Sequence, residues 1–464
     1  EKNILFQNYI GLGYNKSITP SVIKRNILEN PGWYTAYTPY QAEIAQGRLE
    51  ALFNFQTVIT DLTGMKIANA SLLDESTAAA EGMSLLFNIR SNEQKKNKIS
   101  KFFVSNKVLP QTIDLLKTRA EPIGINIIVD CENDFNYTND FFGALFQYPG
   151  KHGEIINLPQ HVEKATALNI KTMVAADLLS LTLLEAPGKF GVDVVVGSSQ
   201  RFGIPLGYGG PHAAFFATKE EYKRYIPGRI IGQTIDMDNN PAFRMALQTR
   251  EQHIKRDRAT SNICTAQVLL AVMAGMYAVY HGPEGLKEIS KSIHLKAVYI
   301  KRNLESIGLQ IKYSKYFDTI TVLCDSKKIK ELAALKKINF CFLSNNEISI
   351  SVNEKTNMKD LKEIISVFEE FMNKESSIEE FPTDIEFINE RKSDILSHPV
   401  FNSYHSETSL MRYIKSLENK DLSLTQSMIS LGSCTMKLNS ASEMIPLSWS
   451  EWNSIHPFVP VDQA

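Results

Sequence analysis

Two stretches of the sequence place polar groups where an α/β protein binds ligands. Residues 74–82 combine small side chains with the hydroxyls of Ser76 and Thr77 at an expected helix start. Free backbone N–H groups and the helix dipole suit such a start to a phosphate, although an ordinary N-cap would have the same sequence. Asp177 follows the apolar run Met173-Val174-Ala175-Ala176. A carboxylate at the end of a parallel strand often points into the ligand crevice, and a helix cap is again the alternative.

The sequence beyond Asp177 lacks a residue that one cofactor chemistry requires. In pyridoxal-phosphate (PLP) enzymes of the aspartate-aminotransferase architecture, such an aspartate keeps the pyridine nitrogen protonated, and a Schiff-base lysine follows roughly two dozen residues later, just past the next strand. Here the expected strand 192–196 leads to Gln200, and no lysine lies between Lys189 and Lys219. A glutamine amide is not nucleophilic and cannot form an imine. We therefore predict a vestigial cofactor site that does not hold the coenzyme covalently, made of Ser76, Thr77, Asp177 and Gln200.

Hydrophobic patterning predicts the elements that position these residues. A helical repeat covers 42–63 and another helix covers 109–119, while short apolar runs predict strands at 102–104, 125–129, 170–176, 192–196 and 212–218. Such alternation implies a parallel sheet covered on both faces. After about residue 280 a smaller α+β domain is expected, with helices at 283–307, 328–335 and 358–371 and strands at 309–313, 319–323 and 347–352.

Composition excludes several classes of protein. The chain has 464 residues and a formal net charge of −1, without the basic surplus of a nucleic-acid-binding protein. No run is apolar enough to predict a membrane span, and the first residues carry no signal-peptide pattern. The five cysteines are widely spaced, which argues against a structural metal site and fits a reducing cytosol.

A possible long-period repeat spans the chain. Ile10-Gly11-Leu12-Gly13 is followed by a turn at 37–42, and Ile429-Ser430-Leu431-Gly432 is followed by 457–464 at a similar spacing. The match is weak residue by residue, so chance is the alternative to a duplication.

Several long strings resemble the P-proteins of the glycine cleavage system, namely residues 34–41, 197–211, 256–265, 405–408 and 428–439. This resemblance implies two homologous halves of the PLP-dependent aminotransferase-like fold (fold type I), of which only the second carries the coenzyme lysine. It implies that the intact enzyme decarboxylates glycine on PLP and passes the aminomethyl group to the lipoyl group of the H-protein. The expected partners are the second half, the H-protein and a second copy of the fused chain.

The resemblance also divides the chain. We expect an N-terminal arm and interface helix (1–60), a large α/β domain without the PLP lysine (61–280), a small α+β domain (281–373), a linker (374–425) and the opening segment of the second half (426–464). Because that half would be incomplete, this chain alone is predicted to be inactive. Location would be cytoplasmic in a bacterium and the mitochondrial matrix in a eukaryote.

A few side chains are candidates to reach the active site of the partner half. In the N-terminal turn they are Tyr37, Thr38 and Tyr40; near the end they are Ser433, Cys434, Thr435 and His456. A Gly-Ser-Cys-Thr loop offers hydroxyls and N–H groups to an anion. Interface packing is the alternative for the tyrosines, and a buried structural role for His456. Two other functions stay open, a purely structural scaffold and an independent PLP-dependent enzyme, against which Gln200 argues.

Overall fold

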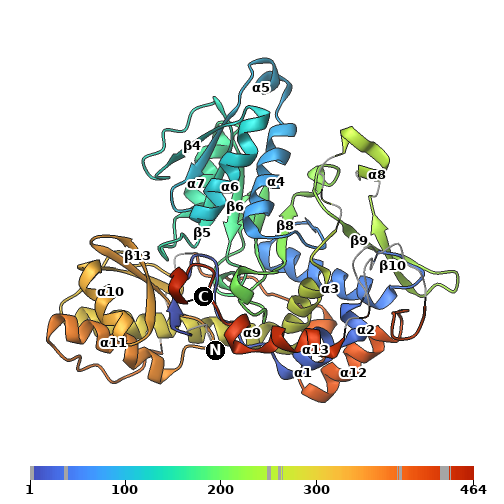
Figure 1. Ribbon diagram of the computed structural model, residues 1–464. Helices are drawn as coiled ribbons and strands as arrows, with labels where there is room; N and C mark the ends of the chain where they lie inside the picture. Colours follow the sequence, from blue (N-terminus) through green and yellow to red (C-terminus); the bar gives the residue numbers. More distant parts are fainter. Residues whose placement is uncertain are drawn as a thin grey trace.

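The larger domain is built on a seven-stranded sheet (Figure 1). The computed structural model describes residues 5–35, 40–247, 252–259, 263, 265–383, 385, 389–428, 438 and 440–463. The strands lie in the order β2 (Ile67–Ala68), β8 (Ala214–Thr218), β7 (Val194–Ser198), β6 (Lys171–Ala176), β5 (Phe141–Tyr148), β3 (Lys101–Ser105) and β4 (Asn126–Asp130).

The sheet is parallel from β7 to β4 and antiparallel at its other edge. All neighbours between β7 and β4 pair in parallel, as the sequence predicts, but β8 runs antiparallel to both β7 and β2. The prediction of a purely parallel sheet is therefore wrong at β8. The physical reason is the connection from β7 to β8, which contains only the short 3-10 turn Gly207–Gly209. The crossover to a parallel neighbour usually contains an α-helix, which this connection lacks.

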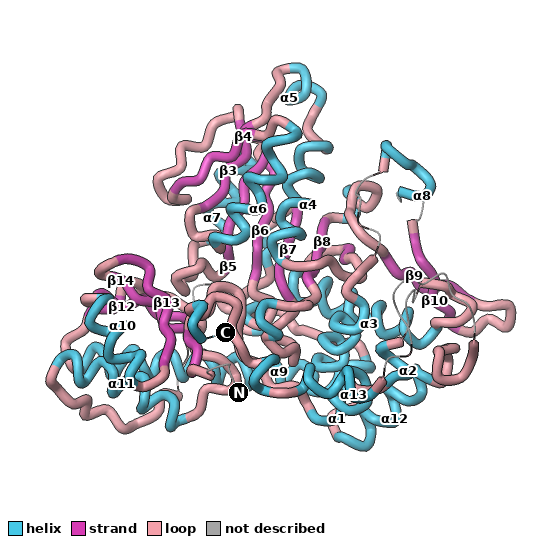
Figure 2. Tube along the Cα trace, viewed as in Figure 1, coloured by secondary structure: helices cyan, strands magenta, loops and turns pink. Residues whose placement is uncertain are grey.

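Helices cover both faces of this sheet, as predicted (Figure 2). Along β6, Met173 and Ala175 pack into the core of one face, and Val174 and Ala176 into the core of the other. This alternation follows from the two-residue period of a strand. One face is covered by α4 (Glu75–Asn88) and α6 (Pro110–Ala120), and the other by α3 (Gln46–Thr63), α7 (Leu158–Ala167) and α9 (Val268–Ser306).

Helix α9 is kinked at Gly282, and the sequence predicts only the part after the kink. The part of α9 after the kink at the non-helical Gly282, whose φ is +63°, agrees with the helix predicted at 283–307, whereas the part from Val268 to the kink was not predicted. Nearly every side chain from Leu270 to Val279 is buried. A helix that is buried all round has no polar face, so its sequence lacks the 3.6-residue pattern that reveals amphipathic helices.

A five-stranded sheet forms the smaller domain. Its order is β1 (Gln7–Tyr9), β13 (Ile338–Ser344), β14 (Glu347–Ser351), β12 (Thr319–Leu323) and β11 (Gln310–Ile311), with α10 (Ser326–Leu335) and α11 (Met358–Met372) packed beside it. Strand β1 pairs in parallel with β13. The N-terminal arm is thus part of the small-domain sheet, which sequence patterning did not reveal.

The prediction of a linker over 374–425 is wrong for its second part. Helix α12 (Glu407–Glu418) buries Leu410, Ile414 and Leu417 and packs against α3. Just beyond α12, the buried Asp421 accepts a hydrogen bond from the Gly47 N–H and pairs with the buried Arg48, with 2.5 Å between Oδ2 and Nη1. The composition of the stretch near residue 380 is polar and acidic, but the apolar face of α12 anchors this later part of the chain to the large domain.

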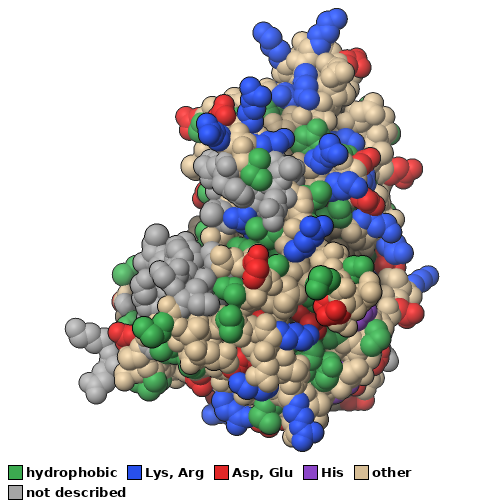
Figure 3. All heavy atoms as spheres, turned by 90° about the vertical axis from the view of Figure 1, so that its right-hand side faces the viewer, with side chains coloured by type: hydrophobic (Ala, Val, Ile, Leu, Met, Phe, Trp, Pro, Cys, Tyr) green, Lys and Arg blue, Asp and Glu red, His purple; other side chains and the backbone are tan. Residues whose placement is uncertain are grey.

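The remaining α-helices and strands are short and lie around these two domains. They are α1 (Ser21–Ile23), α2 (Pro31–Tyr34), α5 (Asn92–Lys96), α8 (Gln252–Lys255), α13 (Ala441–Met444), α14 (Ser450–Asn453) and the hairpin of β9 (Ile230–Ile235) and β10 (Pro241–Ala246). Among the described residues, no helix combines the length and apolar character needed to cross a bilayer. On the face shown in Figure 3, basic, acidic and hydrophobic side chains are interspersed.

Candidate functional site

The carboxyl ends of β6 and β7 bring the predicted residues Asp177 and Gln200 to one edge of the sheet. Asp177 directly follows β6, and Gln200 lies two residues beyond β7, so both reach the crevice where parallel α/β sheets bind ligands. A cavity of about 70 Å³ lies here, between the two domains and the N-terminal segment. Its polar lining comprises Asn15, Glu75, Gln147, Lys151, Asp177, Ser198, Gln200, Arg201, Asp318, Thr319 and Ser351.

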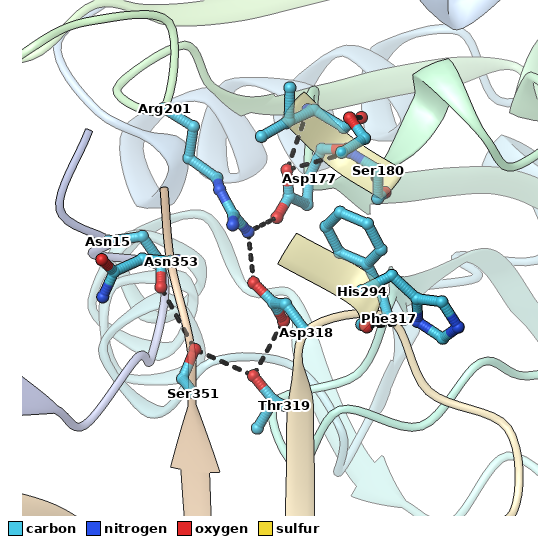
Figure 4. A network of polar contacts seen from close by, with 12 residues as sticks. Asn15, Asp177, Ser180, Arg201, His294, Phe317, Asp318, Thr319, Ser351 and Asn353 are labelled. Carbon is cyan, nitrogen blue, oxygen red and sulfur yellow. Dashed lines mark hydrogen bonds and ion pairs between the residues drawn. The ribbon is translucent and has the colours of Figure 1, made fainter. Parts of the chain in front are cut away.

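Arg201 dominates the electrostatics of this site (Figure 4). Its Nη1 donates to Asp177 Oδ2 at 2.5 Å and also to Asp318 Oδ2, so that one guanidinium joins a carboxylate of each domain. Burial alone would lower the pKa of Arg201, but the two carboxylates outweigh it and raise the pKa above its ordinary value. Burial raises the pKa of Asp318, and the charge of Arg201 opposes that rise.

Both oxygens of Asp177 have partners. While Oδ2 binds Arg201, Oδ1 accepts hydrogen bonds from the backbone N–H groups of Leu179 at 2.9 Å and Ser180 at 3.3 Å. Asp177 therefore does cap the turn after β6, which is the alternative that its sequence position left open. It lies in the crevice as predicted and is paired there within its own chain.

Gln200 is buried and its side-chain amide is fully engaged. Its Oε1 accepts from the Asn15 N–H at 3.1 Å, and its Nε2 donates to the carbonyls of Asn15 and Ile204, each at 2.7 Å. An amide supplies both an acceptor and two donors, so it pairs with the backbone of Asn15 in the manner of a neighbouring strand. A residue at the lysine position thus holds the N-terminal segment against the sheet.

The start of α4 is acidic on the side of the cavity. Asp74 caps the helix by accepting from the Thr77 N–H at 2.7 Å, and the Ser76 hydroxyl contacts that of Thr112 at 3.0 Å. Burial, with a smaller contribution from Asp177, raises the pKa of Glu75 to about 8. The helix N-terminus that the sequence offered as a phosphate site is therefore capped by the Asp74 carboxylate of the chain itself.

The N-terminal segment closes the site from the small-domain side. Ser351 Oγ donates to Asn15 Oδ1 at 3.1 Å, and Thr319 Oγ1 donates to Ser351 Oγ at 2.9 Å. Gly11 has a φ of +68°, and a Cβ placed on it would lie 2.7 Å from the Ser351 Cβ. Only glycine allows this close approach of the segment to β14.

The predicted contributors to a partner active site are only partly described. Tyr37, Thr38, Ser433, Cys434 and Thr435 lie outside the described residues. Tyr40 is buried, its hydroxyl accepts from the Ala266 N–H at 2.9 Å, and the Arg229 guanidinium lies 5.2 Å from its ring centroid.

His456 is also buried, against the N-terminal segment. Its Nε2 lies 3.1 Å from the Gly11 carbonyl, its Nδ1 accepts from the Phe458 N–H at 3.1 Å, and its ring packs edge-on against Tyr14. Burial lowers the pKa of His456 to about 4. The imidazole is therefore neutral at physiological pH.

Sequence reasoning missed six charged or amide residues of the site, Asn15, Glu75, Gln147, Lys151, Arg201 and Asp318. Arg201 stands next to Gln200, and an arginine three residues beyond the end of β7 was a readable signal. Asp318 precedes β12 in another domain, 117 residues from Arg201, so no local pattern could have paired the two. Gln147 lies in β5, an all-buried run that the strand prediction omitted.

Comparisons with known proteins agree with this architecture. The family described as "Glycine cleavage system P-protein" matches residues 1–368. The whole chain is 62% identical over 467 aligned residues to the glycine dehydrogenase (decarboxylating) of Christiangramia forsetii, of which it covers 49%. The chain thus spans about half the length of the curated relatives it matches.

Solved structures of known proteins also resemble this chain. A crystal structure of glycine decarboxylase (P-protein) of the glycine cleavage system, in inhibitor-bound form, is 30% identical with a TM-score of 0.72, covering 79% of this chain and 85% of that one. The aspartate aminotransferase of Thermus thermophilus shares the fold at 14% identity, with a TM-score of 0.53 and coverage of 79% and 99%. By its sequence and its fold, this chain belongs to the P-protein family of the glycine cleavage system.

Proposed function

We propose that this chain is the lysine-less half of a glycine dehydrogenase (decarboxylating). The whole polypeptide would decarboxylate glycine with PLP held by its second half, and would transfer the aminomethyl group to the lipoyl group of the H-protein. The names and the double length of the relatives support this proposal. A homodimer of the fused chain is part of the same proposal.

The observation that carries the proposal is the state of the site at Asp177 and Gln200. The residues present do not fit PLP. No lysine stands at position 200, Asp177 has no oxygen free for a pyridinium, and Glu75 lies where the helix start would meet a phosphate. The remaining space of about 70 Å³ holds about five water-sized groups, less than a pyridine ring with its phosphate requires.

The same residues can perform a structural task. Arg201 joins the large domain to the small domain through Asp177 and Asp318, and Gln200 fastens the N-terminal segment across the junction. Charge-assisted and buried hydrogen bonds of this kind fix a geometry more firmly than exposed ones. This half is therefore suited to hold a rigid surface for the catalytic half.

Assay of glycine–bicarbonate exchange tests the proposal directly. With PLP added, this chain alone should show no exchange above background, whereas the polypeptide containing both halves should be active. The matched control is the isolated chain mixed with the separately produced second half. Robust exchange by this chain alone would overturn the proposal.

The contacts of Tyr40 favour the alternative that this half is a scaffold whose side chains take no part in the chemistry. Its partners Ala266 and Arg229 both lie within this half. In the whole enzyme, Tyr40→Phe removes the hydroxyl that accepts from Ala266 and should cost about 1 kcal/mol of stability. Turnover should stay within about twofold, because the lost bond lies inside this half. A fall of a hundredfold or more with assembly intact would instead place Tyr40 in a shared active site.

A further inference from the structure

Helices α13 and α14 repeat the arrangement of α1 and α2. In each pair, one short helical turn lies between the two helices, at Lys24–Leu28 in the first copy and at Ile445–Ser448 in the second. The spacing between the two Ile-x-Leu-Gly strings of the sequence makes the residues of α2 coincide with those of α14, and it aligns Trp33 with Trp452. The long-period repeat is therefore visible in the local structure at this point.

The two copies differ in what covers them. In the first copy, Trp33 is 3% exposed, and the Arg48 guanidinium of α3 lies 5.3 Å from a ring centroid of that indole. The helical turn before α2 packs against α9 and α12. In the second copy, the aligned Trp452 is 57% exposed. Four large apolar side chains of this copy are more than half exposed, and we call them the C-terminal ridge: Ile445, Leu447, Trp449 and Trp452.

The backbone that carries the C-terminal ridge is fixed to this half by other side chains. Ser448 Oγ donates to Glu29 Oε1 at 2.6 Å, and the Tyr208 N–H donates to the Ile455 carbonyl at 3.2 Å. His456 is buried against the N-terminal segment just beyond the ridge. The ridge is therefore held in place with its apolar side chains in water, which is unfavourable and typical of a surface that a partner covers.

We propose that the C-terminal ridge is the surface on which the second half of the polypeptide docks. The counterparts of α3 and α9 in that half would cover Trp452 in the way that this half covers Trp33. A tryptophan in the middle of such a contact usually contributes much of the binding energy. The inference rests on the proposed function only for the existence of a second, homologous half.

Hydroxyl-radical footprinting read by mass spectrometry tests this on the polypeptide containing both halves, without the H-protein. Trp33 serves as an internal control because it has the same side chain and is buried. Trp452 should be oxidised at a rate within about threefold of Trp33, since the core of an interface packs as densely as a protein interior. In concentrated urea the two tryptophans should react equally.

Two variants of the same polypeptide test whether the ridge acts as one surface. Trp449→Glu places a charge in the proposed contact and should make Trp452 react about tenfold faster, because burying an unpaired charge is costly. Leu335→Glu is the matched control, since Leu335 is an exposed apolar side chain of α10, and it should leave Trp452 as protected as in the wild type. Equal protection of Trp452 in both variants would contradict the proposal.

Two further results would overturn the inference. One is oxidation of Trp452 about tenfold or more faster than Trp33 in the unmodified polypeptide, because no interface then buries it. The other is protection that disappears when the polypeptide is diluted to its monomer, which would assign the ridge to a second copy.

Glycine–bicarbonate exchange, measured on the same samples, separates this inference from the proposed function. An active polypeptide with a reactive Trp452 would remove the docking surface and leave the proposed function standing. An inactive polypeptide with a protected Trp452 would keep the docking surface and remove the proposed function.

Discussion

Replacing Arg201 by methionine should destabilise the protein by about 3–5 kcal/mol, because it leaves two buried carboxylates without their counter-ion. The lost contacts are those to Asp177 and Asp318, and the Asp318 side chain is only 9% exposed. Methionine fills much of the arginine's volume, so the loss is chiefly electrostatic. Urea denaturation of the variant and the wild type at neutral pH measures it.

The destabilisation caused by Arg201→Met should become smaller as the pH falls. Burial raises the pKa of Asp318, and without Arg201 only the hydrogen bond from the Thr319 hydroxyl opposes that rise. A carboxyl whose pKa is raised in the folded state binds more protons folded than unfolded, so stability decreases as the pH rises through the folded pKa. At acidic pH the carboxyl becomes neutral and the penalty falls.

Two controls make the Arg201 prediction specific. Combining Arg201→Met with Asp177→Asn and Asp318→Asn should recover most of the loss, because no unpaired charge then remains buried. Arg25→Met, which removes an ion pair with Glu407 in which both side chains are over 60% exposed, should cost less than about 1 kcal/mol. A similar cost for both arginines, or no recovery in the combined variant, would contradict the account.

Introducing the missing lysine by Gln200→Lys should not create a coenzyme site. The new amine would face a site in which Asp177 is paired with Arg201 and the helix start carries Glu75. After incubation with PLP and borohydride reduction, mass spectrometry should find no stoichiometric label on residue 200. Stoichiometric labelling would show that the lysine is the only feature that the site lacks.

The same substitution should destabilise the chain by about 2–4 kcal/mol. It removes the acceptor of the Asn15 N–H and buries an ammonium in the cavity that Arg201 also lines. Gln200→Met separates these effects, because it loses the hydrogen bonds without adding a charge. The lysine variant should therefore be the less stable of the two in parallel denaturation, and equal stability would count against a charge penalty.

The sequence predicted local features well and distant pairings poorly. Strands such as β6 and β12 follow from short apolar runs, and Gln200 was found because the spacing from Asp177 is a local property of one βαβ-like unit. The Arg201–Asp318 pair and the packing of α12 on α3 depend on chain segments that meet only after folding. No periodic pattern within a window of about 20 residues predicts contacts between such distant segments.

The pairing of β1 with β13 has a consequence for the order of events during synthesis. Asn339 Nδ2 donates to Asn8 Oδ1 at 2.7 Å, across 331 residues of sequence. At translation rates of about 5–20 residues per second, the first strand leaves the ribosome roughly 20–70 s before its partner exists. During that interval the strand has an open edge, which other chains could pair with. The large domain can form its core meanwhile, so the small-domain sheet should be the last part to close and the step most dependent on protection from aggregation.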